Sequence, residues 1–233
     1  MRAVLCYSLG MVSTYAVLTG DIISSRTLKQ EEKAQIVKQI QQTHSNLPDF
    51  FQLRETSGLS MFRGDGWQFA LLPAHQALRV AVYVRCTLKG MNITHADSRI
   101  GIGIGPISTL TVGESGTGDG PAFQLSGKAL DELKRSKGFK IQLDSSNEIG
   151  KTALAAIATA VNHLILRLTI SQAKAVCGAL RGWNHQQIAD SWEPRPVTRQ
   201  SITKHLKSAG WDVLEQQIQS FEHIISTLTG ESL

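Results

Sequence analysis

Strand-like and helix-like segments alternate along the first 145 residues of the chain, whereas only helix-like segments follow. The β-branched apolar run TYAVLTG (14–20) is typical of a strand. The segment LKQEEKAQIVKQIQQTH (28–44) has apolar residues at helical spacing and charges on the opposite face, as an amphipathic helix does. This order predicts an α+β domain followed by a small all-α part.

The later segments extend the same pattern. We expect a hairpin from 50–56 and 66–72, helices at 74–90 and 121–137, and strands at 98–112 and 139–143. The central order is βαββαβ, which is the ferredoxin-like arrangement. In that topology the end of the first strand lies beside the turn between the second and third strands.

At 233 residues the chain is long enough for one large domain or two small ones. We expect an N-terminal extension at 1–14, an α+β domain at 15–145, a connector or dimer helix at 146–170 and a helical domain at 171–233.

Two aspartates occupy the places that this topology brings together. Asp21 follows the first strand, and Asp65 lies in the hairpin turn of RGDGWQFALL. Each alone is simply explained as a strand end or a turn residue, Asp65-Gly66 being a typical turn pair. Together they can bind Mg²⁺ or Mn²⁺, hard cations that prefer oxygen ligands and share them with substrate phosphates. The chain after Asp21 is expected to enter a helix, where the N–H groups of Ile23, Ser24 and Ser25 suit phosphate oxygens.

Glycines at 101, 103 and 105 alternate with isoleucines in the expected strand SRIGIGIGPISTLTV. One face of this strand therefore has no side chains. The sequence leaves two interpretations open: a helix packed closely on the strand, or room for a nucleotide.

The segment NHQQIADSWEPRPVTRQSITKHLKSAGW (184–211) fits a helix-turn-helix, with Ile202 and Leu206 facing inward. Residues 181–211 have five basic and two acidic side chains, whereas 212–233 has four acidic and no basic ones. The alternative to a DNA-binding helix-turn-helix is an ordinary small helical bundle with a solvated polar face. Polar side chains at the start of the second helix are placed to contact DNA bases or phosphates. The candidate DNA contacts are Arg195, Arg199, Gln200, Ser201, Thr203, Lys204 and Lys207.

The remaining composition indicates a cytoplasmic protein with no membrane span. The three cysteines are odd in number and lack metal-ligand spacing, which suits free thiols in a reducing compartment. The N-terminus lacks a clear signal-peptide cleavage site.

The order of four motifs resembles the class III nucleotidyl cyclase homology domain, and the whole chain more closely resembles the SatD family of bacterial proteins, in which a shortened cyclase-like domain precedes a helix-turn-helix. The motifs are LTGDII (18–23), FRGDGWQF (62–69), RIGIGIGP (99–106) and GDGPAFQLSGKAL (118–130). The resemblance implies two metal ions on Asp21 and Asp65, with the Ile22 carbonyl as a further ligand. It also implies a head-to-tail homodimer that binds a nucleoside triphosphate between its subunits.

In the cyclase family, the partner subunit supplies an Asn and an Arg to the reaction. The corresponding residues here are Gln124 and Lys128, and Lys lacks the bidentate geometry of Arg. The positions that read adenine in the family are occupied by Met61 and Thr117, so that pair is absent. Asp119, at the end of a glycine-rich loop, is expected near the shared site.

Two functions follow from the resemblance. The first is a nucleotide-responsive DNA-binding regulator. The second is an active cyclase whose tail serves dimerisation or partner docking.

Overall fold

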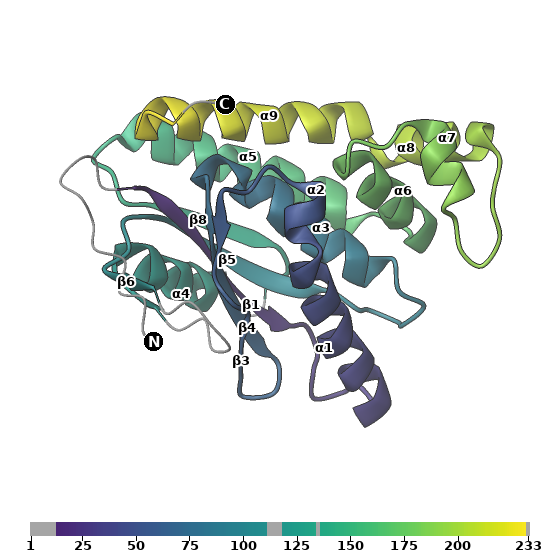
Figure 1. The fold of residues 1–233 in the computed structure, drawn as a ribbon, viewed down its shortest axis with the longest axis horizontal. Helices are drawn as coiled ribbons and strands as arrows, with labels where there is room; N and C mark the ends of the chain where they lie inside the picture. Colours follow the sequence, from purple (N-terminus) through teal and green to yellow (C-terminus); the bar gives the residue numbers. More distant parts are fainter. Residues whose placement is uncertain (1–12, 111–117, 134–135, 232–233) are drawn as a thin grey trace.

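A mixed six-stranded sheet in the order β2-β4-β1-β5-β8, with β3 also paired to β4, lies at the centre of the fold (Figure 1). The structure is a computed structural model that describes residues 13–110, 118–133 and 136–231. The strands of this sheet are β1 (Tyr15–Ile22), β2 (Glu55–Thr56), β3 (Ser60–Phe62), β4 (Gly66–Leu72), β5 (Ser98–Gly105) and β8 (Phe139–Leu143). A separate two-stranded ladder joins β6 (Thr109–Leu110) to β7 (Gly118–Asp119).

Strand β1 is central and pairs antiparallel with both β4 and β5, whereas β5 pairs in parallel with β8. Helix α4 (Pro121–Leu133) makes the connection between those two parallel strands. The expected α+β fold is therefore present, with a mixed sheet and a set of C-terminal helices.

The glycine face of β5 is filled by helix α4. A Cβ atom built on Gly101 would lie 2.2 Å from the Ser126 carbonyl oxygen, and one on Gly103 would lie 2.2 Å from that of Ala122. Both distances are far below any real contact, so these glycines allow the helix backbone to rest directly on the strand. Of the two interpretations left open by the sequence, close helix packing is the one that the structure supports.

The opposite face of the sheet is covered by α1 (Gln30–Ser45) and α3 (Ala77–Lys89), the latter preceded by the 3-10 turn η1 (Ala74–Gln76). Ile100, Ile102 and Ile104 alternate with the glycines of β5 and join the buried cluster beneath these helices. The period-two pattern of β5 thus directs its glycines toward α4 and its isoleucines toward the opposite layer.

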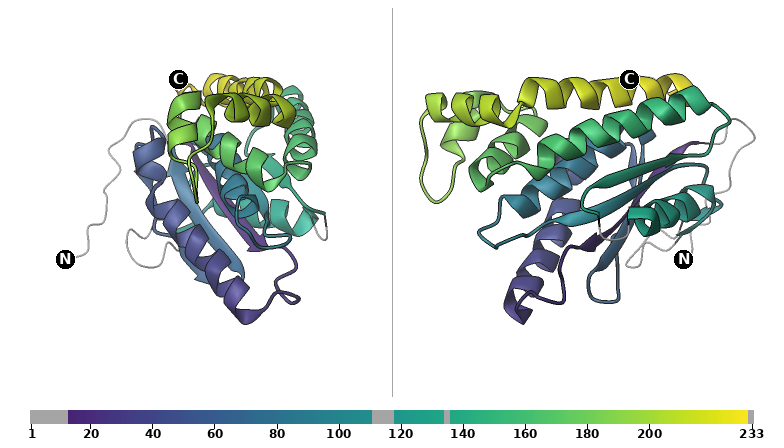
Figure 2. Two further views of the ribbon diagram at one scale, coloured as in Figure 1. Left: turned by 90° about the vertical axis from the view of Figure 1, so that its right-hand side faces the viewer. Right: turned by 180° about the vertical axis from the view of Figure 1, so that it is seen from behind.

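The C-terminal helices are α5 (Glu148–Leu166), α6 (Ile170–Leu180), α7 (His185–Asp190), α8 (Arg199–Ala209) and α9 (Trp211–Thr229). Helices α5 and α9 lie side by side along one edge of the molecule (Figure 2). Buried residues of the tail, such as Ile202 and Phe221, belong to the same hydrophobic cluster as Leu18 of β1. The hydrophobic core is therefore continuous across the boundary expected at 145–170, and the division into independently folding domains stays a prediction.

Several expected elements have different bounds. The first hairpin strand was expected at 50–56, but Leu47–Phe50 forms the short helix α2 and only Glu55–Thr56 is a strand. Pro48, at the start of α2, favours a helical first turn. The glycine-rich strand ends at Gly105, before Pro106, which has no N–H to donate to a strand ladder.

Helix α5 is, among the described residues, the one helix long and apolar enough to cross a membrane by length and composition, with a mean hydropathy of 1.4. Core helices pass the same test, and α5 packs against β8 and α9. Asn162 of α5 also accepts a hydrogen bond from the Phe139 N–H at 2.8 Å and donates one to the Phe139 carbonyl at 3.0 Å.

Candidate functional site

Asp21 lies near the end of β1, between two neighbouring strands. Its partners in register are Gly66 on β4 and Arg99 on β5. The next residue, Ile22, donates its N–H to the Asp65 carbonyl at 3.0 Å. The structure therefore places Asp21 and Asp65 together, and both line the same cavities at this edge of the sheet.

The hairpin between β3 and β4 is present, but its turn differs from the expected one. Phe62 pairs with Gly66, and the positive φ angles are at Arg63 (53°) and Gly64 (78°). The turn therefore consists of Arg63, Gly64 and Asp65, and Gly66 is the first residue of β4. Asp65 lies in the hairpin turn as expected, but the interpretation of Asp65-Gly66 as the turn pair was wrong. The Asp65 carboxylate accepts a hydrogen bond from Ser25 Oγ at 2.5 Å.

Arg99 forms a bidentate ion pair with Asp21. Its Nε donates to Asp21 Oδ1 at 2.8 Å, and its Nη2 donates to Oδ2. The hydrogen bond with Asp21 raises the pKa of Arg99. Sequence reasoning missed this residue, although the antiparallel pairing of β1 with β5 would have placed it opposite Asp21.

A buried network beneath Asp21 fixes the position of the strand end. Trp67 Nε1 donates to Ser98 Oγ at 3.0 Å, and Ser98 Oγ donates to the Asp21 carbonyl at 2.7 Å. The N–H of Ile23 donates to the Asp97 carbonyl at 3.0 Å. The Asp21 carbonyl is thus hydrogen-bonded to Ser98 of β5, and the Ile23 N–H is hydrogen-bonded to Asp97, the residue before β5.

The residues Ile23, Ser24 and Ser25 line the cavity, but they are not at a helix N-terminus as expected. Residues 23–27 form turns, Ser24 has a φ of 57°, and helix α1 begins only at Gln30. The Ile23 N–H is already bonded to Asp97, so it is not available to a phosphate. Within the described part of the chain, the N–H groups of Ser24 and Ser25 donate no hydrogen bond.

Two adjoining cavities of about 490 and 670 Å³ share Asp21, Asp65 and Arg99. Such volumes are typical of small-molecule sites. The first cavity adds Arg26 and Lys137, and the second adds Arg63 and Asp131. Counting all seven charged side chains, the combined wall has four basic and three acidic groups, a composition suited to a metal ion together with a polyanion.

The oxygen-rich donor set fits a hard divalent cation. Each carboxylate oxygen has more than one lone pair, so the ion pair with Arg99 leaves Asp21 able to bind a metal. Among the described residues, no group of three or more His, Cys, Asp or Glu side chains is placed to hold a metal ion. The protein would therefore supply two carboxylates, and phosphate or water oxygens would complete the shell, as is common for Mg²⁺.

Gln124 and Lys128 both lie on exposed positions of α4. Lys128 lines a different cavity, of about 390 Å³, beside Asp144 and Lys151. Within one chain, the face of α4 that reaches the Asp21 cavity presents Gly127, Leu130 and Asp131 instead. Gln124 and Lys128 are therefore separate from the two aspartates in the same subunit.

The other residues expected to contact a nucleotide are not gathered at the aspartates either. Met61 pairs with Trp67 in the hairpin and packs against the hydrophobic core. Asp119 lies in β7, which follows the far end of β5, and its Oδ1 accepts the Gly120 N–H at 2.7 Å. Thr117 lies outside the described residues.

The sequence model of the SatD family matches residues 15–224, which include both the sheet and the C-terminal helices. The chain belongs to the SatD family. No curated protein matches this SatD-family chain.

Two solved structures are similar to part of the SatD-family chain. One is the guanylyl cyclase Cya2, with 16% identity and a TM-score of 0.38 over 51% of this chain and 70% of that one. The other is a bacterial light-regulated adenylyl cyclase, with 15% identity and a TM-score of 0.42 over 56% of this chain and 75% of that one.

In the SatD-family tail, helices α6, α7 and α8 pack on one another. Asn184 caps α7 by accepting from the N–H groups of Gln186 and Gln187, and Thr198 caps α8 by accepting from that of Ser201. Gly210 ends α8 in the left-handed conformation, with a φ of 69°. The two helices expected within 184–211 are thus present as α7 and α8.

The polar residues expected to contact DNA have different environments. Thr203 Oγ1 is 3.0 Å from His185 Nδ1, and Ser201 Oγ is 2.9 Å from Thr198 Oγ1. The Thr203 hydroxyl therefore joins α8 to α7, whereas the Ser201 hydroxyl bonds the N-cap residue of its own helix. The other five side chains are exposed and form no ion pair with a described residue: Arg195, Arg199, Gln200, Lys204 and Lys207.

Arg181, which contributed to the basic composition of this region, is used inside the protein. Its guanidinium donates to Tyr83 Oη at 2.6 and 2.9 Å and lies over the rings of Phe50 and Trp183. Burial is the main cause that raises the pKa of Tyr83 to about 12. The exposed positive charge of the tail is therefore concentrated in α8 and the segment before it.

Proposed function

We propose that this SatD-family protein binds a nucleoside triphosphate with Mg²⁺ or Mn²⁺ in the cavity of Asp21 and Asp65. The observation that carries the proposal is the placement of these two carboxylates at adjacent chain segments, in a cavity that also contains basic side chains. The metal would neutralise part of the triphosphate charge when bound. The Ile22 carbonyl is a further candidate ligand.

Basic groups around the cavity support a polyanionic ligand. Arg26 and Lys137 line it and form no ion pair with a described residue, so both can bind phosphate oxygens. Arg99 is partly neutralised by Asp21 and is the positioning group for that carboxylate. The free hydroxyl and N–H of Ser24 add uncharged donors.

The nucleotide site is completed, in this proposal, by a second copy of the chain arranged head-to-tail. Gln124 and Lys128 are exposed on α4, and neither lines the cavities of the aspartates in their own subunit. An exposed position on a different face is what a contribution to the neighbouring subunit requires.

The tail is proposed to be a helix-turn-helix that binds DNA through α8. Arg199, Gln200 and Lys204 are exposed at and near the N-terminal end of this helix, which is where recognition helices contact base edges. In this proposal the tail helices can take more than one position relative to the sheet. Nucleotide binding would alter DNA binding only if the nucleotide binds the protein with different affinity in those positions.

The nucleotide proposal is tested by calorimetric titration of each of the four ribonucleoside triphosphates with and without Mn²⁺. We expect metal-dependent binding that Asp21→Ala and Asp65→Ala abolish, and that Asp49→Ala, at an exposed position on α2, leaves unchanged. Absence of metal-dependent binding would return the aspartates to a structural role. Mass spectrometry of the same mixtures for a cyclic nucleotide and pyrophosphate separates the alternative: product that Asp65→Ala eliminates would identify an active cyclase.

The DNA proposal is tested by fluorescence anisotropy with a mixed-sequence duplex over a range of salt concentrations. We expect salt-sensitive binding, weakened by Gln200→Ala and Lys204→Ala but not by Gln216→Ala on the exposed face of α9. Equal behaviour of all three variants would point to a protein partner for the tail.

A further inference from the structure

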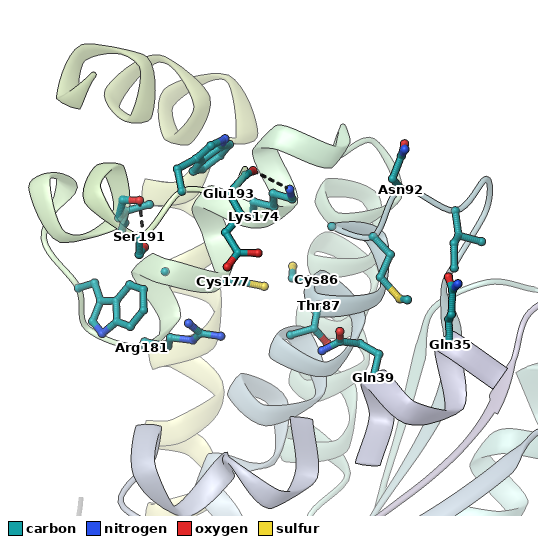
Figure 3. A pocket seen from close by; sticks show the side chains of 17 residues that line it. Gln35, Gln39, Cys86, Thr87, Asn92, Lys174, Cys177, Arg181, Ser191 and Glu193 are labelled. Carbon is teal, nitrogen blue, oxygen red and sulfur yellow. Dashed lines mark hydrogen bonds between the residues drawn. The ribbon is translucent and has the colours of Figure 1, made fainter. Parts of the chain in front are cut away.

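Two cysteines that are distant in sequence meet in a cavity away from the aspartates. Cys86 of α3 and Cys177 of α6 are both buried free thiols. Both line a cavity of about 580 Å³ between the helices of the α/β part and those of the tail. In Figure 3 their sulfur atoms point toward one another across the gap between the two helices.

The two thiols lie close to one another (Figure 3). Burial is the main cause that raises the pKa of Cys86 well above its ordinary value, and the neighbouring Cys177 raises it further. Cys86 is completely buried, whereas Cys177 retains 8% of its exposed area. A small molecule in the cavity would therefore reach Cys177 first.

The cavity is polar enough to admit water and small polar reagents. Its wall includes Gln35 and Gln39 of α1, Lys174 of α6, Arg181 at the C-terminal cap of α6, and Glu193 after α7 (Figure 3). Lys174 Nζ donates to the Glu193 carbonyl at 3.4 Å, which leaves its charge without a carboxylate partner among the described residues. Cys177, which is not completely buried, can therefore be reached from this cavity without unfolding of the helices.

The pair suits covalent redox chemistry better than metal binding. A structural metal such as Zn²⁺ requires about four ligands, usually thiolates and imidazoles. In the described part of the chain, no third Cys, His, Asp or Glu joins these two thiols to form such a group. A disulfide, in contrast, needs only two neighbouring thiols.

We propose that Cys86 and Cys177 form a reversible redox site, oxidised by a hydroperoxide to a disulfide that joins α3 to α6. In the first step, the Cys177 thiolate attacks a peroxide oxygen, the O–O bond breaks, and a sulfenic acid and one water form. In the second step, Cys86 loses its proton and attacks the Cys177 sulfur, the S–O bond breaks, and a second water leaves. With hydrogen peroxide, two thiols are oxidised to one disulfide while the peroxide is reduced to two waters.

The disulfide would tie the tail helices to the α/β part. Helix α6 packs against α3 on one side and against α8 on the other. A bond between Cys86 and Cys177 would therefore restrict movement of the α7–α8 pair relative to the sheet. This site is independent of the proposed nucleotide and DNA contacts.

The test is peptide mapping of the full-length native protein after treatment with a small excess of hydrogen peroxide and alkylation of the remaining thiols. We expect a mass loss of about 2 Da relative to the reduced protein before alkylation, a peptide pair linked through Cys86 and Cys177, and recovery of both thiols with dithiothreitol. Cys6→Ser is the matched control and should form the same linked pair. Cys177→Ser should leave Cys86 as a free thiol.

Three outcomes would overturn the proposal. These are sulfinic acid on Cys177 without a linked pair, a disulfide that includes Cys6, and two unreacted thiols under conditions that oxidise free glutathione. The linked peptide in the unaltered chain is the primary readout, so a folding defect in a variant does not affect it. A thermal melt of Cys177→Ser identifies any such defect directly.

Discussion

Arg99 holds the Asp21 carboxylate with two hydrogen bonds from the position directly opposite on the neighbouring strand. This ion pair is partly exposed, with 24% of the Arg99 side chain and 25% of the Asp21 side chain accessible. The ion pair fixes the position of Asp21, one of the two candidate metal-binding carboxylates, before a metal ion or a nucleotide binds. It also reduces the negative charge that a cation would meet in the cavity.

Replacement of Arg99 should change metal and nucleotide binding in opposite directions. In Arg99→Met the carboxylates of Asp21 and Asp65 lose a nearby positive charge, so affinity for Mn²⁺ alone should rise by roughly fivefold to tenfold. Affinity for the metal–nucleotide complex should fall, because Asp21 is no longer oriented. Calorimetry measures both. Arg26→Met, on the rim of the same cavity, is the control and should weaken only nucleotide binding; an Arg99→Met protein with unchanged Mn²⁺ affinity would contradict the argument.

Much of this site follows from the sequence, because the βαββαβ order specifies which strand ends are adjacent. Asp21 and Asp65 could be placed together from that order alone. Arg99 could not be identified without the β1–β5 register, since a shift of one residue would point it to the other face. The three-residue turn Arg63-Gly64-Asp65 was missed because Asp-Gly is the stronger local turn pattern, while positive φ at Arg63 depends on the pairing of Phe62 with Gly66.

Contacts between the tail and the sheet were also beyond sequence reasoning. The acidic composition of 212–233 indicated no partner within the chain, yet Glu215 and Glu222 of α9 bind Arg79 of α3. That arrangement depends on how α9 lies along the molecule, which no local pattern specifies. The glycines of β5 were recognised, but only the position of α4 decides between packing and an open nucleotide site.

Arg79 should be a major stabilising contact between α9 and the rest of the protein. It donates to Glu222 Oε1 at 2.6 Å and to Glu215 Oε1 at 2.9 Å, and only 15% of its side chain is exposed. Arg79→Met leaves two acidic side chains near one another without a cation, and should lower the free energy of unfolding by about 1–3 kcal/mol. Urea unfolding followed by circular dichroism measures this loss.

The control for Arg79 is Arg54→Met. Arg54 also contacts a glutamate near the C-terminus, Glu231 at 3.4 Å, but 64% of its side chain is exposed. Its replacement should change the free energy of unfolding by about 0.5 kcal/mol or less. Equal effects of the two variants would show that burial of the Arg79 contacts is unimportant.

The buried Arg85–Asp97 pair should be among the most sensitive positions in the chain. Arg85 is fully buried, and its Nε and Nη2 donate to the two Asp97 carboxylate oxygens at 2.8 and 2.7 Å. Asp97→Asn retains the shape but leaves the guanidinium without its counter-ion, and should cost about 3–5 kcal/mol. The exposed Asp49→Asn is the control, and a loss below about 1 kcal/mol for Asp97→Asn would contradict the interpretation.

Two alanine substitutions test the close packing of α4 on β5. Gly103→Ala places a methyl group against the Ala122 backbone and must displace the helix, so it should destabilise the protein by about 1–3 kcal/mol. Gly127→Ala, on α4 itself, meets no atom within 4 Å and should stabilise it by about 0.5–1 kcal/mol. Thermal unfolding of both variants should show a lower stability for Gly103→Ala and a higher one for Gly127→Ala. A Gly103→Ala protein as stable as the unaltered chain would mean that α4 does not rest on this strand.

His44 should make the protein less stable as the pH falls below about 6.5. Burial lowers the pKa of His44, while its hydrogen bond with the Ser57 carbonyl, 2.9 Å from Nε2, opposes that shift. Because the pKa of His44 is lower in the folded protein than in the unfolded chain, the unfolded chain binds the proton first as the pH falls. The contribution of His44 to the free energy of unfolding is therefore complete above the pKa of the unfolded chain and is lost as the pH falls through the pKa of the folded protein. His44→Gln retains a donor for Ser57 but does not titrate, so its unfolding free energy, measured in urea from pH 7.5 to 5, should fall less steeply than that of the unaltered protein. Identical slopes for the two proteins would show that His44 is not responsible for the pH dependence.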